Sequence, residues 1–418
     1  MIALYAKLKR ITSIGVFRQL SWYTAAQVVI QFFSFLGVIV TSRYLGPSNV
    51  GLYSFVQNYL LAFMTLTAGM EFYFTWKLAK SEERLRDAKE YFGHKLNITL
   101  LLSILGIAAA WSILPQDVAV LATIMFAPLF LTSCSVFSQY AVVTENARMV
   151  AVTQACGSAA SLMLKMILVY FGAPLTAFVI VGVLDMIIVG VVLMCLFLLP
   201  QKNRAIFMES VYPPFWKTVS FIYSIRVSLI AVALWQLILR IDQLVLATFS
   251  NAYTLGIYAA AVKIAEVPNF LAGSLYAALV THVSVFAAKQ DDHSKRRIKQ
   301  VLILYATIGV VIAFFIILFA PVAIQLLYGS QFLDAVPVLR AYALSVPGMF
   351  MAVHYFGIYG AREMHWFQVW VFFFALVVNI GLIFILTPLF GLSGAAIATA
   401  IAYSLVAATF YVHVSFKL

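Results

Sequence analysis

Long apolar runs, separated by short polar or basic segments, fill almost the whole chain. Each run is about as long as the 20 residues that an α-helix needs to cross a bilayer, whereas the strands of a transmembrane β-barrel would alternate over segments about half as long. The pattern therefore predicts an all-α polytopic membrane protein with about twelve spans. They cover approximately residues 20–40, 51–75, 96–114, 118–138, 150–171 and 176–199, then 223–249, 254–287, 301–320, 338–359, 365–387 and 393–415.

One polar segment divides the chain into halves. It carries Pro213-Pro214 and several charges, and we predict a cytoplasmic linker at 201–222 between an N-terminal six-helix lobe at 1–200 and a C-terminal six-helix lobe at 223–418. Basic and apolar residues are interleaved ahead of the first span, so we also expect an interfacial helix at the N-terminus.

Short motifs repeat between the halves. Val50–Ser54 opens the second span and Leu255–Ala259 opens the eighth, while Phe171-Gly172 and Phe390-Gly391 precede the sixth and twelfth spans. Because six spans return the chain to its starting side, the halves should share one orientation and be related by an axis along the membrane normal. This arrangement predicts two lobes around a central cavity.

The distribution of basic residues predicts the orientation. Of 27 Lys and Arg residues, 22 fall on the side of the N-terminus and only Arg43 and Arg340 fall on the other. Cytoplasmic loops carry such an excess, so we expect both termini in the cytoplasm. The net charge of +12 is then explained without a nucleic-acid partner.

Signatures of enzymes and metal sites are missing from the sequence. The cysteines Cys134, Cys156 and Cys195 lie in apolar runs without metal-ligand spacing, no P-loop is present, and no loop holds paired carboxylates suited to glycosyl chemistry. We therefore expect no catalytic residues, no metal and no cofactor.

Six charged residues lie well inside predicted spans, where each costs roughly 2.5 to 3.5 kcal/mol if it faces lipid. Either they form ion pairs that hold helices together, or they line a cavity that meets an anionic substrate or a coupling ion. The cations Arg240, Lys263 and Lys165 are the candidates for substrate binding, and the carboxylates Asp185, Asp242 and Glu266 are the candidates for ion coupling.

Depth and helical spacing predict how these charges pair. Lys165 and Asp185 lie at similar depth, as do Asp242 and Lys263, and Glu266 follows Lys263 by three residues on one helix. Arg240 is then the cation that we expect to remain available. Pro268, just beyond Glu266, should kink the eighth span.

Four segments, in order along the chain, resemble the polysaccharide-transporter family of Wzx-type O-antigen and exopolysaccharide flippases. They are Arg43–Pro47 with Val50–Ser54, Ile241–Leu246 with Leu255–Tyr258, Leu327–Gly329 with Phe332, and Leu389–Ala396. The resemblance implies the fold of the multidrug, oligosaccharidyl-lipid and polysaccharide exporter superfamily, with two lobes and alternating access.

The resemblance also implies a function. It is that of a bacterial inner-membrane flippase that moves undecaprenyl-diphosphate-linked oligosaccharide repeat units to the periplasmic leaflet. Exchange for a proton or sodium ion, and work alongside a polysaccharide polymerase and a chain-length regulator, are expected with it. Arg240 and Lys263 match the family's basic cavity residues better than Lys165 does. The first half departs from the pattern, because the repeat places Phe35 and Asn58 at the positions of Arg240 and Lys263.

Three other functions stay open. A lipid-linked peptidoglycan-precursor flippase is one of them, although it usually has two further spans that this chain lacks. A multidrug and toxic-compound extrusion exporter shares the fold but should carry an acidic residue in the first span, where only Gln27 and Gln31 are polar. A membrane-bound polysaccharide polymerase or glycosyltransferase is the alternative among enzymes, and the short outer loops oppose it.

The predicted topology can be tested by labelling introduced cysteines with a membrane-impermeant reagent. Because the basic residues place the N-terminal side in the cytoplasm, cysteines at Ser81 and Ser294 should react only from the cytoplasm, and one at Asn251 only from outside. A cysteine-free parent controls for the native thiols. Periplasmic labelling at Ser294 would overturn the span assignment.

Overall fold

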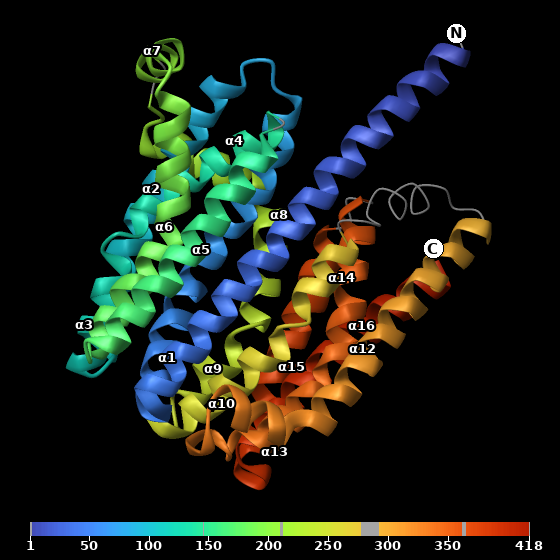
Figure 1. Cartoon of the computed structure of the whole chain (residues 1–418). Coiled ribbons are helices and arrows are strands. Elements are labelled where there is room, and N and C mark those ends of the chain that lie inside the picture. Colours follow the sequence, from blue (N-terminus) through green and yellow to red (C-terminus); the bar gives the residue numbers. More distant parts are fainter. Residues whose placement is uncertain (1, 145, 210–211, 277–291, 362–364, 418) are drawn as a thin grey trace. The chain divides into compact units, whose positions relative to one another are not determined.

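A computed structural model of the chain describes residues 2–144, 146–209, 212–276, 292–361 and 365–417, and these hold helices and no strand (Figure 1). The all-α class is confirmed. The elements are α1 Ile2–Lys80, α2 Arg84–Ile113, α3 Gln116–Phe126, η1 Leu129–Ser135, α4 Val136–Val143, α5 Ala147–Tyr170, α6 Leu175–Leu198, α7 Gln201–Glu209, α8 Phe215–Ile238, α9 Ile241–Leu246, α10 Ala252–Glu266, α12 Asp292–Leu327, η2 Ser330–Phe332, α13 Ala335–Ala343, α14 Ser345–Ala361, α15 His365–Phe390 and α16 Leu392–Lys417.

The described helices account for the predicted spans. Ten are long and apolar enough to cross a membrane, or eleven if the bent pair α13 and α14 forms one span. One of the ten, Gln27–Thr75, has 49 residues, far more than one crossing needs, and it breaks at Gly46 (φ 71°, ψ 172°) before Pro47. Divided there, it supplies the first and second spans. All twelve predicted spans then have a counterpart, although 277–287 of the eighth lie outside the described residues.

The N-terminal segment is helical and continues into the first span without a break, because α1 is regular from Ile2 to the turn at Gly46. Its position at the membrane interface remains a prediction.

Three of the predicted spans are interrupted along their length. The fourth consists of α3, the 3₁₀ helix η1 and α4, with Pro128 at the first junction, and the seventh breaks at Leu239–Arg240 between α8 and α9. The eighth breaks at Val267–Pro268 and resumes at 269–276, as expected for proline, which lacks the N–H that the helix requires.

The internal repeat is visible in two turns. Gly172 between α5 and α6 has φ 65°, and Gly391 between α15 and α16 has φ 61°. This left-handed conformation favours glycine, which explains why the Phe-Gly motif occurs at both places.

The chain forms two compact units, and each is described separately. Unit 1 contains Met1–Val40 and Met70–Ser224, and unit 2 contains Thr41–Gly69 and Ile225–Leu418. Part of α1 thus packs within unit 2, and both α1 and α8 pass from one unit to the other. The predicted lobe boundaries remain a prediction.

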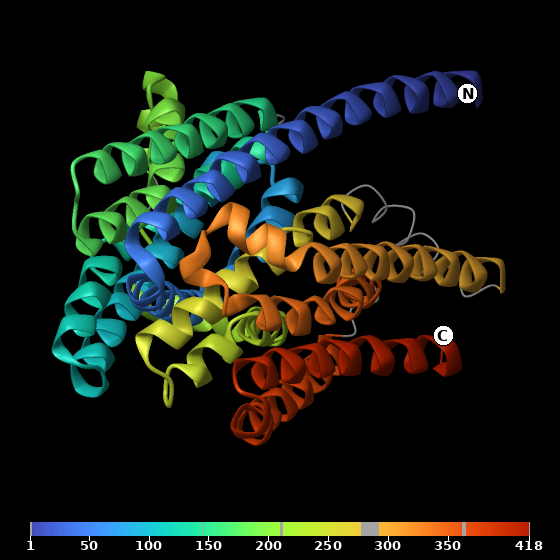
Figure 2. The ribbon, with the colours of Figure 1, turned by 60° about the horizontal axis from the view of Figure 1, so that its bottom comes forward.

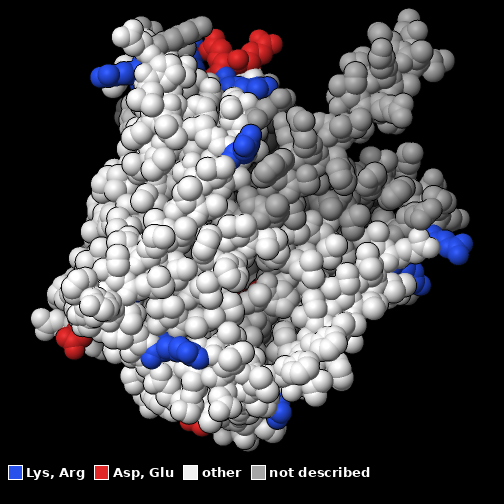
Figure 3. Space-filling view, in the orientation of Figure 1, with Lys and Arg blue, Asp and Glu red and all other residues white. Residues whose placement is uncertain are grey.

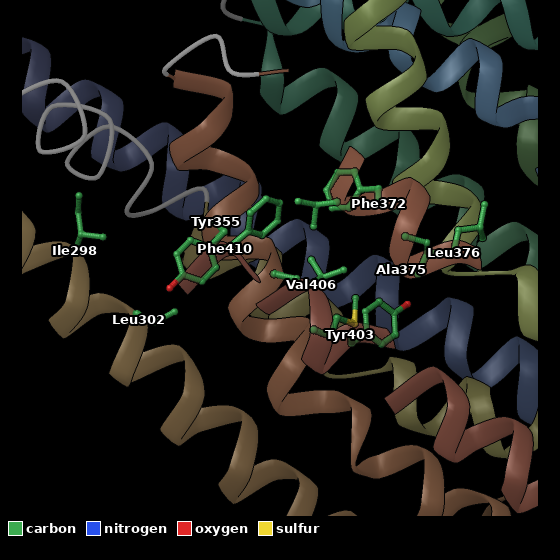
Figure 4. Close-up of a cluster of buried hydrophobic side chains, with 13 residues drawn as sticks. Ile298, Leu302, Tyr355, Phe372, Ala375, Leu376, Tyr403, Val406 and Phe410 are labelled. Atoms are coloured by element: carbon green, nitrogen blue, oxygen red, sulfur yellow. The ribbon is translucent and has the colours of Figure 1, made fainter. Parts of the chain in front are cut away.

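Unit 2 has a large apolar core in which α15 and α16 run side by side, as Figure 2 shows in red. Tyr355, Phe372, Tyr403 and Phe410 fill its centre (Figure 4). Helix association in lipid depends on close packing, because the surrounding hydrocarbon is as apolar as the side chains.

Charged side chains on the face shown in Figure 3 gather toward the ends of the helices, with a broad uncharged surface between them. Large apolar residues of the long helices, such as Ile104, Met163 and Phe314, are exposed. An exposed apolar surface of this extent fits a bilayer rather than water, so the chain is a multi-pass membrane protein.

Candidate functional site

The break in the seventh span determines where Arg240 and Asp242 point. α8 ends at Ile238, the backbone N–H of Arg240 donates to Leu237 O at 2.9 Å, and Arg240 itself has φ −129° and ψ −14°. The short helix α9 then begins at Ile241. A discontinuous span of this kind is tolerated in a membrane where protein or water satisfies the freed backbone groups.

Asp242 is completely buried and contacts only neutral groups. Its side-chain exposure is 0%, and its carboxylate accepts hydrogen bonds from Tyr258 Oη at 2.7 Å, from the Gln243 backbone N–H at 2.8 Å, and from Thr399 Oγ1 at 3.5 Å. No basic side chain of the described residues lies within 4.0 Å of it. A buried carboxylate without a cationic partner is unusual, which marks Asp242 as a candidate for ion coupling.

The expected pair between Asp242 and Lys263 is therefore not formed. The reason lies in the helical spacing of α10. Lys263 follows Tyr258 by five residues, which is about 140° around the helix axis. Because Tyr258 faces Asp242, Lys263 lies on a different face. The depth of a residue in the predicted span could not show whether Tyr258 or Lys263 faces Asp242.

Arg240 forms an ion pair with Glu266 of α10. Nη1 of Arg240 lies 3.1 Å from Oε1 and 3.3 Å from Oε2 of Glu266, and the side chains are 22% and 16% exposed. The expectation that Arg240 remains available was wrong, since Glu266 pairs with it rather than with Lys263. Within the described part of the chain, Lys263 has no carboxylate within 4.0 Å. Glu266 is paired with Arg240, and Lys263 precedes it by one turn on α10.

In unit 1, Lys165 and Asp185 form the ion pair that their depth suggested, with Nζ 2.8 Å from Oδ2. The stem of Lys165 packs over Gly37, where a Cβ atom would lie 3.4 Å from its Cδ. Asp185 therefore differs from Asp242, because its charge is compensated by a cation.

A further ion pair in unit 1 was missed from the sequence. Lys95, counted above among the cytoplasmic basic residues, has 0% side-chain exposure, and its Nζ bonds Glu71 and Ser135. The Ser135 hydroxyl also donates to Glu71 Oε1 at 3.0 Å. Ser135 ends η1, so the 3₁₀ segment of the fourth span brings it to the pair. Glu71 keeps 37% exposure. The one sequence signal was the position of Glu71 inside a predicted span.

Lys95 is fully buried and Glu71 is partly exposed, so substitutions of the two residues should reduce stability by different amounts. Glu71→Gln leaves a fully buried ammonium without a counter-charge, which should cost about 3 to 5 kcal/mol and lower the amount of protein in the membrane. Lys95→Met leaves a carboxylate that still reaches solvent, so the loss of thermal stability in detergent should be much smaller. The double variant should recover most of it. Equal losses in both single variants would contradict the assignment.

Comparisons with known proteins agree with this architecture. A family model described as "Polysaccharide biosynthesis protein" matches residues 16–284. No curated protein matches the sequence. A solved structure of a multidrug resistance MATE family transporter of the MOP superfamily, in an inward-facing conformation, is 15% identical, with 93% of this chain and 94% of that chain covered and a TM-score of 0.77.

Two further solved structures are similar. The lipid II flippase MurJ, in an inward closed conformation, is 15% identical over 94% of this chain and 87% of that chain, with a TM-score of 0.72. A MOP superfamily transporter from Pyrococcus furiosus is 15% identical over 94% and 96%, with a TM-score of 0.62. Such identities establish the fold alone. The family match covers well over half of the sequence, so the chain belongs to the polysaccharide biosynthesis protein family and has the fold of MOP superfamily transporters.

Proposed function

We propose that the protein is a flippase of the bacterial inner membrane. It moves oligosaccharide repeat units linked to undecaprenyl diphosphate, for O-antigen or exopolysaccharide, from the cytoplasmic to the periplasmic leaflet by alternating access. The family match supports a role in polysaccharide biosynthesis, and the likeness to a lipid II flippase supports a lipid-linked substrate.

The observation that carries the proposal is the group of two cations around one carboxylate in unit 2. Arg240 pairs with Glu266, and Lys263 precedes Glu266 by three residues on α10 without an ion pair among the described residues. Arg240, Lys263 and Glu266 together have an excess of one positive charge, which the neighbouring Asp242 offsets when it is ionised and leaves in place when it holds a proton or cation. The lipid tail of the substrate can stay in the bilayer, whereas its diphosphate must cross a region of low dielectric constant. Fixed cations there lower that barrier.

The geometry also suggests how the diphosphate gains access to Arg240. A guanidinium can bind two phosphate oxygens at once, so a diphosphate competes with the single carboxylate of Glu266. Glu266 has an alternative partner one turn away, because residues three apart on a helix are neighbours. An exchange of Glu266 from Arg240 to Lys263 would expose the guanidinium without leaving the carboxylate unpaired. Lys165, already paired with Asp185, is a weaker candidate for binding.

Ion coupling is assigned to Asp242 in this proposal. Of the three candidate carboxylates, Asp185 and Glu266 each have a cationic partner, and Asp242 has only hydroxyl and amide donors. A buried carboxylate surrounded by oxygen atoms can take up a proton or a small hard cation such as sodium. The flippase would then work as an antiporter that exchanges such an ion for its substrate.

A multidrug exporter is the second candidate function, and the similarity to a MATE family transporter favours it. The excess positive charge around Arg240 and Lys263 argues for an anionic substrate. Competition for transport separates the two functions. An organic-cation drug should compete with the substrate of an exporter, whereas a lipid-linked diphosphate should compete with the substrate of the proposed flippase.

Substitutions of Arg240 test the binding role. Because lysine keeps the charge but cannot form the bidentate contact, Arg240→Lys should impair transport partly and Arg240→Ala severely. Both proteins should be present in the membrane at normal levels. Transport is measured as complementation of a flippase-deficient strain, with protein abundance determined from the same cells.

The double variant Arg240→Ala/Glu266→Gln separates binding from structure. If Arg240 only neutralises Glu266, the single Arg240→Ala variant loses about 3 to 5 kcal/mol and becomes scarce, and the double variant transports normally. If Arg240 binds the diphosphate, the double variant is abundant and inactive. Rescue of transport would therefore exclude the binding role.

A further inference from the structure

Within unit 2, the part of α1 that follows the Gly46 turn crosses α10 in backbone contact. A Cβ atom on Gly51 would lie 1.9 Å from the carbonyl oxygen of Ala252, and one on Gly256 would lie 1.8 Å from that of Pro47. No side chain fits at either place. The contact is reciprocal, since Gly51 and Gly256 occupy equivalent positions in the two repeats. We call this backbone contact between α1 and α10 the Gly51–Gly256 closure.

Polar contacts hold the same closure at the turn. Nε of Arg43 donates to Leu327 O at 2.8 Å, and a second guanidinium nitrogen donates to Leu326 O, both at the end of α12. Gln331 Nε2 returns a hydrogen bond to Arg43 O at 3.1 Å. The turn is thereby tied to the C-terminal half of the chain, and the orientation predicted above places this end on the periplasmic side.

One buried hydrogen bond links this closure to the neighbourhood of Asp242. Asn58, two turns beyond Gly51 on α1, donates from Nδ2 to Gln243 Oε1 at 2.8 Å. Gln243 in turn donates its backbone N–H to Asp242 Oδ1 at 2.8 Å. Both amide side chains are buried, and Gln243 Nε2 has no partner among the described residues. A single residue of α9 therefore contacts both the carboxylate and the closing helix.

We propose that Asn58 and Gln243 are positioning residues that make the Gly51–Gly256 closure depend on whether Asp242 holds an ion. This inference rests on the proposed function, in which Asp242 takes up a proton or sodium ion. A proton or cation on Oδ1 makes that oxygen a weaker acceptor for the Gln243 N–H. Because α9 has six residues and turns on both sides, its first turn can rotate, which withdraws Gln243 Oε1 from Asn58 and releases α1.

The groups around Asp242 define what else can respond to pH. Charged or titratable side chains that act on it come from the α8–α9 break, α10, α13 and α16. They are Arg240, Tyr258, Glu266, Tyr342 and Tyr403. Because Glu266 is also a carboxyl group in this set, a pH effect on the closure is assigned to Asp242 only if Asp242→Asn abolishes it.

The test measures how far the closure opens in the full-length protein in lipid nanodiscs. Cys134, Cys156 and Cys195 are replaced by alanine, and Val50→Cys, a buried position beside Gly51, serves as the reporter. Its rate of labelling by a charged maleimide is compared at low and high pH and with and without sodium. Each rate is divided by that of a free thiol under the same conditions, which removes the pH dependence of thiolate formation. The ion-dependent change in rate should be at least about fivefold, the factor expected from one buried hydrogen bond.

Two near-isosteric variants, Asn58→Leu and Gln243→Met, should each reduce that change to less than about twofold. The matched control is Asn49→Leu on the same helix. Asn49 bonds only Leu45 O within α1, so this variant should keep the full response. Thermal stability of every variant is measured in parallel, because a bond that merely packs α1 against α9 would lower stability and leave the ion response intact.

The outcomes separate the two ideas. If Asp242→Asn abolishes the ion response and Asn58→Leu and Gln243→Met retain it, the linkage is wrong and the coupling role of Asp242 stands. If Asp242→Asn retains the response, or the reporter shows none, the coupling role itself fails and the linkage fails with it. Loss of the response in all three variants, with Asn49→Leu unaffected, supports the proposal.

Discussion

The high cost of an unpaired charge in a membrane constrains where every ionisable residue of this protein can lie. Lys95, Lys165 and Arg240 each sit inside a helical span, and each pairs with a carboxylate on a neighbouring helix. Such pairs are net neutral and can be structural. The residues that depart from this rule within the described part of the chain are Asp242 and Lys263, and both lie in unit 2 on adjacent helices.

Interruptions of the helices bring these polar groups together. The seventh span breaks beside Arg240, the eighth breaks at Pro268 shortly after Glu266, and the 3₁₀ segment of the fourth ends at Ser135, which bonds the Lys95–Glu71 pair. A broken span lets a side chain leave the regular helical spacing, and it provides a place where the backbone can turn. The charged side chains and the breaks at which the backbone can turn therefore lie in the same spans.

Much of the fold follows from the sequence. Apolar runs located the twelve spans, and the Phe-Gly motifs marked two turns that need a left-handed residue. Pair assignments were less accurate. Depth correctly joined Lys165 to Asp185, but it could not show that Tyr258 rather than Lys263 faces Asp242, because the rotation of α10 depends on packing. The break at Leu239–Arg240 contains no proline or glycine, so no local signal announced it. The burial of Lys95 and its pair with Glu71 were not anticipated, since a basic residue near a span end usually reaches water.

The most direct test is a comparison of two lipid-linked substrates in proteoliposomes that contain the purified protein. One carries an oligosaccharide on a polyprenyl diphosphate, and the other carries the same oligosaccharide on a neutral linkage, with transfer between leaflets followed by access of a sugar-modifying enzyme to the outer surface. If cations in unit 2 carry an anionic substrate, the diphosphate-linked lipid should cross much faster with the protein than without it, and the neutral lipid should not. Equal transfer of both lipids would contradict the assignment of Arg240 and Lys263 to the diphosphate.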